Sequence, residues 1–116
     1  HASGDEVLLE FSKRIFNNLR SIDLAARYGG EEFVVVMPDT DADFALYIAE
    51  RLRKTISDKP FEISGSAEPI SITVSIGVSI VNEGCDTKEK LLSEADKALY
   101  KAKESGRNKV CGIKCI

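Results

Sequence analysis

Two adjacent glycines between two strand-forming runs are the feature that most restricts how this 116-residue chain can fold. Gly29 and Gly30 separate a short apolar run at 24–28 from a second run at 33–37. Glycine supplies the positive φ values that tight turns between antiparallel strands require, so the pattern predicts a β-hairpin. A sheet that contains this hairpin needs helices to cover it, which favours a fold that mixes helices and strands.

The remaining segments alternate between helical and strand-like patterns. Apolar residues recur at intervals of three and four in three segments, and apolar and polar residues alternate over 70–76. The elements expected outside the hairpin are helices at 5–19, 44–56 and 87–102 and strands at 61–64, 70–76 and 110–113. This order indicates an α/β or α+β fold in which helices cover one sheet.

Composition and charge fit one globular domain. Hydrophobic residues make up 43% of the chain and charged residues 30%, which is enough apolar side chain for one core. The net charge of −3 gives no overall basic field, so nucleic acid is not an expected partner, and no apolar run is long enough to span a membrane. The three cysteines match no zinc or disulfide pattern, which favours reduced thiols and a cytoplasmic protein.

The predicted hairpin carries two adjacent carboxylates at its tip, Glu31 and Glu32. Neighbouring residues on a strand point to opposite faces, so one of the two is expected to face a ligand unless the turn distorts the strand. Taken alone, the same tetrapeptide also fits a solvated turn with surface acids.

Four segments, in this order, resemble the GGDEF family of diguanylate cyclases. The sequence at 27–33 is similar to the family signature in its glutamate-containing form, and residues 1–8 resemble the later part of the upstream motif. The segment at 74–79 resembles the central strand, and 95–103 followed by 106–108 resembles the last helix and its exit. The resemblance implies a palm-like nucleotidyl-cyclase sheet of about five strands covered by helices, and condensation of two GTP molecules into cyclic di-GMP with release of pyrophosphate.

The resemblance also implies roles for the signature residues. Glu31 would bind Mg²⁺ or Mn²⁺, and its carboxylate oxygens suit such hard cations. Glu32 would lie near the nucleophile, a ribose 3′-hydroxyl that attacks the α-phosphate of the second GTP. Gly29 and Gly30 would let the backbone approach the nucleotide.

Four further residues match the GTP-binding positions of the family. Asp5 would accept hydrogen bonds from the guanine edge, and Leu8 would pack against the base. Lys103 and Arg107 would hold the phosphates, for which ammonium and guanidinium groups are suited. From the residues alone, Asp5 is also expected at the start of a helix, and the basic pair also fits a solvated helix end.

A second constellation resembles the product-inhibition site of the family. Arg20 and Asp23 match its Arg-x-x-Asp pair, in which an arginine fork reads guanine O6 and N7 and a carboxylate reads the other polar edge. Arg51 resembles the secondary arginine that completes the site. As isolated features, the first two residues fit an ion pair and Arg51 fits a surface arginine.

The family domain begins earlier than this sequence. The resemblance therefore implies that residues 1–116 are a GGDEF domain lacking its N-terminal strand and first helix, with a metal-binding Asp on that strand. This segment by itself is expected to be a poor cyclase, and its exposed sheet edge favours dimerisation. The parent protein is expected to act as a homodimer under an upstream sensor or receiver domain. The alternatives are a non-catalytic module that binds cyclic di-GMP and another palm-type nucleotidyl transferase.

Overall fold

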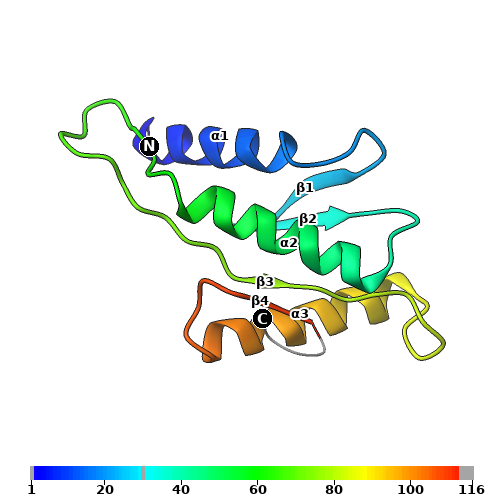
Figure 1. Ribbon diagram of the computed structural model, residues 1–116. Coiled ribbons are helices and arrows are strands. Elements are labelled where there is room, and N and C mark those ends of the chain that lie inside the picture. The colour runs from blue at the N-terminus through cyan, green and yellow to red at the C-terminus, as the bar shows by residue number, and fades with distance from the viewer. Residues whose placement is uncertain (1, 30, 113–116) are drawn as a thin grey trace.

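The computed structural model describes residues 2–29 and 31–112. Within these residues the chain forms three helices and four strands (Figure 1). In chain order they are α1 (Ala2–Phe16), β1 (Leu24–Gly29), β2 (Glu32–Val36), α2 (Ala42–Ser57), β3 (Ile76–Gly77), α3 (Lys88–Glu104) and β4 (Val110–Cys111). The mixed α/β class, the hairpin and the three helices predicted from the sequence are confirmed.

A regular apolar stripe and well-made N-caps explain α2 and α3. The carboxylate of Asp41 accepts a hydrogen bond from the Phe44 backbone N–H at 2.8 Å, which satisfies an amide that a helix start leaves without a partner. Thr87 caps α3 in the same way, because its hydroxyl accepts from the Lys90 N–H at 3.1 Å. The buried face of α2 consists of Ala45, Ile48, Ala49, Leu52 and Ile56.

Helix α1 is joined to the end of α2 by one buried arginine. The side chain of Arg14 is 8% exposed, pairs with Glu10 at 2.8 Å, and places its guanidinium 3.8 Å from the centre of the Phe61 ring. The last carbonyls of a helix have no partner within the helix, and a side-chain donor can satisfy them. Arg14 donates to four backbone carbonyls at and beyond the end of α2, at 2.6–3.3 Å: those of Thr55, Ile56, Lys59 and Pro60.

The described strands form two separate pairs. β1 and β2 pair antiparallel, whereas β3 and β4 pair parallel. The prediction of regular strands at 61–64 and 70–76 is wrong over most of their length, because a single bridge joins Phe61 to Ile70 and ladder pairing starts only at Ile76. An alternating segment becomes a regular strand only beside a hydrogen-bonding neighbour, and 71–75 belongs to no ladder in the described part of the chain.

The helices cover the strands from two sides. In Figure 1, α1 lies above the hairpin and α3 below it. Phe11 of α1 contacts Phe33 of β2, with ring centroids 5.1 Å apart. Below, Gly77 of β3 lets α3 pack directly on the strand, because backbone atoms of Ala95 and Leu99 occupy the space that a Cβ would need.

The state of the cysteines differs in part from the prediction. Cys85 is a buried free thiol, as expected, but Cys111 is disulfide-bonded, so the prediction of reduced thiols is wrong there. Sequence spacing could not decide this point, since pairing depends on how close two cysteines come in the fold. Ile113 and Cys115 lie outside the described residues. Among the described helices, none is both long and apolar enough to cross a bilayer.

Candidate functional site

The acidic tip of the hairpin is exposed to solvent. Glu31 lies in the turn, and Glu32 pairs with Gly29 at the end of the ladder. The register shifts between Arg27 and Gly29, so the regular alternation of side chains is interrupted just before the tip. Glu31 itself lies in the turn and not in a strand, so the alternation of strand side chains does not apply to it.

Gly29 is not required by the backbone of the hairpin. The φ of Gly29 does not lie in the left-handed region, so the expectation that this residue supplies a positive φ is wrong. Gly30 lies outside the described residues. An added Cβ at Gly29 would meet no atom within 4 Å. Neither the turn nor the packing therefore explains this glycine, and the space beside it is open to solvent.

The carboxylates at the tip fit a hard divalent cation in type but not in number. Glu31 and Glu32 are exposed oxygen donors, which suit Mg²⁺ or Mn²⁺. Over residues 2–29 and 31–112, however, no group of three or more acidic, histidine or cysteine side chains comes together that could hold a metal ion. The described residues thus supply part of such a site.

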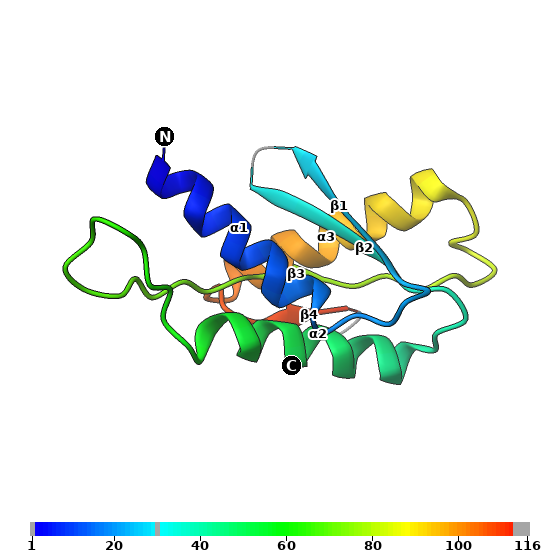
Figure 2. The same cartoon turned by 90° about the horizontal axis from the view of Figure 1, so that it is seen from above.

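The elements that carry residues predicted to bind GTP end towards the same side of the molecule as the hairpin, with the start of α1 above the hairpin and the end of α3 below it in Figure 1. Figure 2 shows the start of α1, the end of β1 and the end of α3 on one side. Asp5 is exposed in the first turn of α1, as predicted, and Leu8 is half-buried one turn later. Lys103 is exposed in the last turn of α3.

The chain leaves α3 in an unusual conformation. Gly106 has φ of 117°, and Arg107 and Asn108 follow with φ of 62° and 48°. Left-handed conformations are uncommon for residues other than glycine and persist where the surroundings hold them, often at binding sites. Here the Arg107 N–H donates to the Ala102 carbonyl at 3.0 Å, and Arg53 donates to Asn108 Oδ1 at 2.8 Å. The exposed Arg107 side chain therefore projects from a fixed loop.

Arg20 and Asp23 form an ion pair before β1. Arg20 Nη2 lies 2.9 Å from Asp23 Oδ1, and the Arg20 backbone N–H donates to Asp23 Oδ2 at 2.8 Å. The same Nη2 donates to the Pro38 carbonyl at 3.1 Å and to Thr40 Oγ1 at 2.5 Å. Phe44 packs against the guanidinium, with its ring centroid 5.3 Å from Arg20 Cζ. Contacts from three parts of the chain thus fix the orientation of this arginine.

The two members of the pair differ in exposure. The Asp23 side chain is 2% exposed and that of Arg20 is 35% exposed. The hydrogen bond from Arg20 holds the pKa of the Asp23 carboxyl below its usual range, and the same bond raises the pKa of Arg20. The buried carboxylate therefore stays charged and orients an arginine whose outer edge faces solvent.

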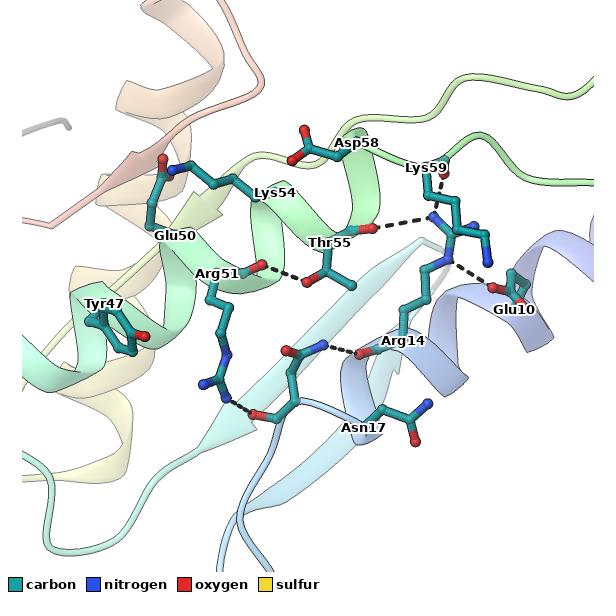
Figure 3. A pocket seen from close by; sticks show the side chains of 11 residues that line it. Glu10, Arg14, Asn17, Tyr47, Glu50, Arg51, Lys54, Thr55, Asp58 and Lys59 are labelled. Carbon is teal, nitrogen blue, oxygen red and sulfur yellow. Dashed lines mark hydrogen bonds and ion pairs between the residues drawn. The ribbon is translucent and has the colours of Figure 1, made fainter.

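Arg51 lines an open groove of about 720 Å³ between α1 and α2 (Figure 3), and neither Arg20 nor Asp23 is among the residues that line it. Its Nη2 donates to the Asn18 carbonyl at 2.6 Å, which connects α2 to the segment that leads into Arg20. Its Cζ lies 5.9 Å from the centre of the Tyr47 ring, and Tyr47 and Lys54 line the same groove. The three residues predicted for product binding are therefore brought to one region of the surface.

Sequence reasoning missed the residues that surround Arg20 and Arg51. Thr40 stands just before the helix predicted at 44–56, and Phe44 fits the apolar spacing of that helix, although the residue is 39% exposed. Tyr47 carried no motif. The only available signal was the spacing of 44, 47 and 51, which places all three residues on one side of a helix.

Comparison with known proteins gives consistent results. The family described as "Diguanylate cyclase, GGDEF domain" matches residues 1–109. Response regulator PleD of Caulobacter vibrioides is 54% identical over 112 residues, covering 97% of this chain and 25% of PleD. Diguanylate cyclase A of Treponema denticola is 46% identical over 110 residues, covering 95% of this chain and 29% of that protein. The chain thus spans about a quarter of the length of these relatives.

Solved structures share the fold. The GGDEF domain of DgcB from Caulobacter crescentus, in complex with c-di-GMP, matches with a TM-score of 0.89 and 32% identity over 97% of this chain and 66% of that chain. The active GGEEF domain of a diguanylate cyclase from Vibrio cholerae matches with a TM-score of 0.87 and 33% identity over 97% of this chain and 69% of that chain.

Proposed function

The chain belongs to the GGDEF family of diguanylate cyclase domains, and on this premise we propose that its parent protein condenses two GTP molecules into cyclic di-GMP. We further propose that the product binds at Arg20, Asp23 and Arg51. The observation that carries the catalytic proposal is the exposed acidic tip beside Gly29, a glycine that neither the turn nor the packing requires. Close approach of a nucleotide to the backbone explains it.

In this proposal the start of α1 and the end of α3 hold the nucleotide between them. Asp5 accepts hydrogen bonds from the guanine edge and Leu8 packs on the base. Lys103 and Arg107 bind the phosphates, which suits their positive charge and their position in the last turn of α3 and just after it. The fixed loop at 106–108 orients Arg107 before the nucleotide arrives.

Glu31 would hold a divalent cation, Mg²⁺ or Mn²⁺, and Glu32 would lie near the attacking 3′-hydroxyl. When bound, the cation supplies neutralisation of the charge that develops on the phosphates. Each domain holds one GTP, so two domains must face each other to close the cyclic product. A homodimer is therefore required, and the relation to a response regulator supports an upstream receiver or sensor domain that controls the pairing.

A second candidate function is a module that binds cyclic di-GMP without making it. The oriented ion pair of Arg20 and Asp23 supports it, since this pair can bind a ligand without any of the catalytic residues. The two candidates predict different behaviour of the longer protein towards GTP, and cyclic di-GMP formation distinguishes them.

The first test is calorimetric titration of the chain with cyclic di-GMP. We expect saturable binding that Arg20→Ala abolishes, because Arg20 presents the only exposed edge of the ion pair. Unchanged binding by Arg20→Ala, with circular dichroism showing a native fold, would contradict the product site.

The second test follows cyclic di-GMP formation from GTP by the longer protein. Glu31→Gln should lower turnover by about a hundredfold or more, since it removes a charged group that acts in the transition state. Glu83→Gln, an equally exposed glutamate in another loop, is the matched control. Equal turnover by Glu31→Gln and the control would refute the role of Glu31, and absence of product from the unmodified protein would favour the binding module.

A further inference from the structure

Two exposed aromatic side chains of α2, Phe44 and Tyr47, lie between two arginines, Arg20 from the segment before β1 and Arg51 from α2. The rings of Phe44 and Tyr47 have centroids 6.2 Å apart and are inclined by 31°. Arg20 Cζ lies 5.3 Å from the Phe44 ring centre, and Arg51 Cζ lies 5.9 Å from the Tyr47 ring centre. These four residues, Arg20, Phe44, Tyr47 and Arg51, are the arginine–aromatic row.

The packing of α2 does not account for the two rings. The helix buries a different set of residues, and Tyr47 is 60% exposed and Phe44 39% exposed. Two neighbouring aromatic rings on a surface, each beside a guanidinium, present flat apolar faces next to positive charge. Aromatic and guanidinium planes of this kind are surfaces on which nucleobases stack, whatever the base.

Charge around the row favours an anionic ligand. Lys54 lines the same groove as Arg51. Of the acidic side chains that line the groove, Glu50 pairs with Arg53 at 2.7 Å and Glu10 with Arg14 at 2.8 Å, while Asp58 accepts a hydrogen bond from the Ser57 hydroxyl. Arg20 is itself paired with Asp23, so Arg51 and Lys54 are the cations of this region that face phosphate groups.

Asp23 restricts how a base can be recognised here. Its side chain is 2% exposed and its two oxygens both accept hydrogen bonds from Arg20, so it is turned towards the arginine and not towards solvent. Recognition by the carboxylate alone would require the pair to open. The exposed edge of Arg20 and the adjacent rings provide contact area without that rearrangement.

We propose that the arginine–aromatic row is a stacking platform on which a guanine base of bound cyclic di-GMP lies against Tyr47 and Phe44. This inference rests on the product site proposed above and adds the two aromatic residues to it. Arg20 and Arg51 flank the rings, so each arginine–aromatic pair offers a flat face and a cation, and the ligand brings two purines and two phosphates. Asp23 acts in this arrangement as a positioning residue for Arg20.

A tryptophan probe tests the contact directly. The chain contains no tryptophan, so Tyr47→Trp introduces a single indole into the row. A guanine stacked on an indole quenches the fluorescence of the indole. We therefore expect saturable quenching on titration with cyclic di-GMP, at the same ligand concentration as the midpoint of the calorimetric titration. Tyr100→Trp, at a tyrosine that is 66% exposed on α3, is the matched control and should show no such quenching.

Truncation measures how much the ring contributes. Tyr47→Ala should weaken cyclic di-GMP binding by about tenfold or more, since stacking on one aromatic ring contributes on that order, whereas Tyr47→Phe should retain it. Tyr100→Ala should bind like the unmodified chain. The ring is exposed, so these variants are expected to fold, which circular dichroism verifies.

The outcomes separate the row from the site on which it rests. Loss of binding in Arg20→Ala together with unchanged binding in Tyr47→Ala and no quenching in Tyr47→Trp would overturn the row and leave the product site standing. Absence of binding by the unmodified, folded chain would overturn both. Quenching in Tyr47→Trp that disappears in Tyr47→Trp combined with Arg20→Ala would support both.

Discussion

The contact between β3 and α3 makes Gly77→Ala the most informative single substitution for the fold. An added Cβ would overlap the Ala95 carbonyl oxygen and the Leu99 amide nitrogen and would lie 2.9 Å from Leu99 Cα. All three are backbone atoms, so no side-chain rotation can relieve the overlap. Either the strand or the helix has to move.

The expected loss of stability can be estimated from overpacking in other cores. Extra methyl or methylene groups in well-packed interiors destabilise by roughly 1–3 kcal/mol. The overlap at Gly77 involves helix backbone, so we expect about 3 kcal/mol or more. A small domain is stable by only about 5–15 kcal/mol in total. For a chain of this size, a loss of about 3 kcal/mol corresponds to a Tm lower by roughly 10 °C.

Urea denaturation and thermal unfolding followed by circular dichroism measure this loss. Gly84→Ala is the control, because a Cβ there would meet only Asn82 Oδ1, at 3.6 Å, and should change the free energy of unfolding by no more than about 0.5 kcal/mol. If Gly77→Ala matched the control, direct packing of α3 on β3 would be refuted.

Two further predictions concern a helix cap and the acid limb of stability. Asp41→Ala removes the cap of α2 and should lower the free energy of unfolding by about 1 kcal/mol in urea denaturation, and an unchanged midpoint would show that the cap contributes nothing. Hydrogen bonds from arginines lower the pKa of Glu10, Asp23 and Glu50 in the folded state. These carboxylates therefore stabilise the fold fully at pH above their unfolded-state pKa of about 4. The stabilisation is lost as the pH falls through their lower folded-state pKa. Tm measured from pH 7 to pH 2 should therefore fall in the acid range, and Asp23→Asn should make that fall smaller. Identical profiles of Tm against pH for the unmodified chain and Asp23→Asn would contradict a lowered pKa of Asp23 in the folded state.

Local patterns determined the elements that need no distant partner. The hairpin and the helices follow from two strand-forming runs separated by a short turn, from apolar spacing and from caps such as Thr87, all of which lie within a few residues of the element. The segment at 70–76 has an equally clear alternation, yet it forms a regular strand only from Ile76, because a strand also needs a neighbour. The alternation of apolar and polar residues shows which face of a strand is buried, but it does not show whether a neighbouring strand is present to pair with it.

The candidate site divides along the same line. Arg20 and Asp23 were predictable as a pair because they are three residues apart and precede the hairpin. Thr40 and Phe44 could not be predicted as their neighbours, since they reach Arg20 from a separate turn and helix. Motif spacing identifies the residues of a site, whereas the contacts that orient them arise only in the folded chain.

The hydrogen bonds of Arg14 have a consequence for how the chain unfolds. They connect residues 41 to 46 positions apart, and a single side chain serves all of them. Separation of α1 from α2 therefore deprives several carbonyls at the end of α2 of their donor at the same moment. The two helix ends have little opportunity to open one at a time, so slow amide hydrogens in α1 and in the last turn of α2 belong to one cooperative unit of exchange.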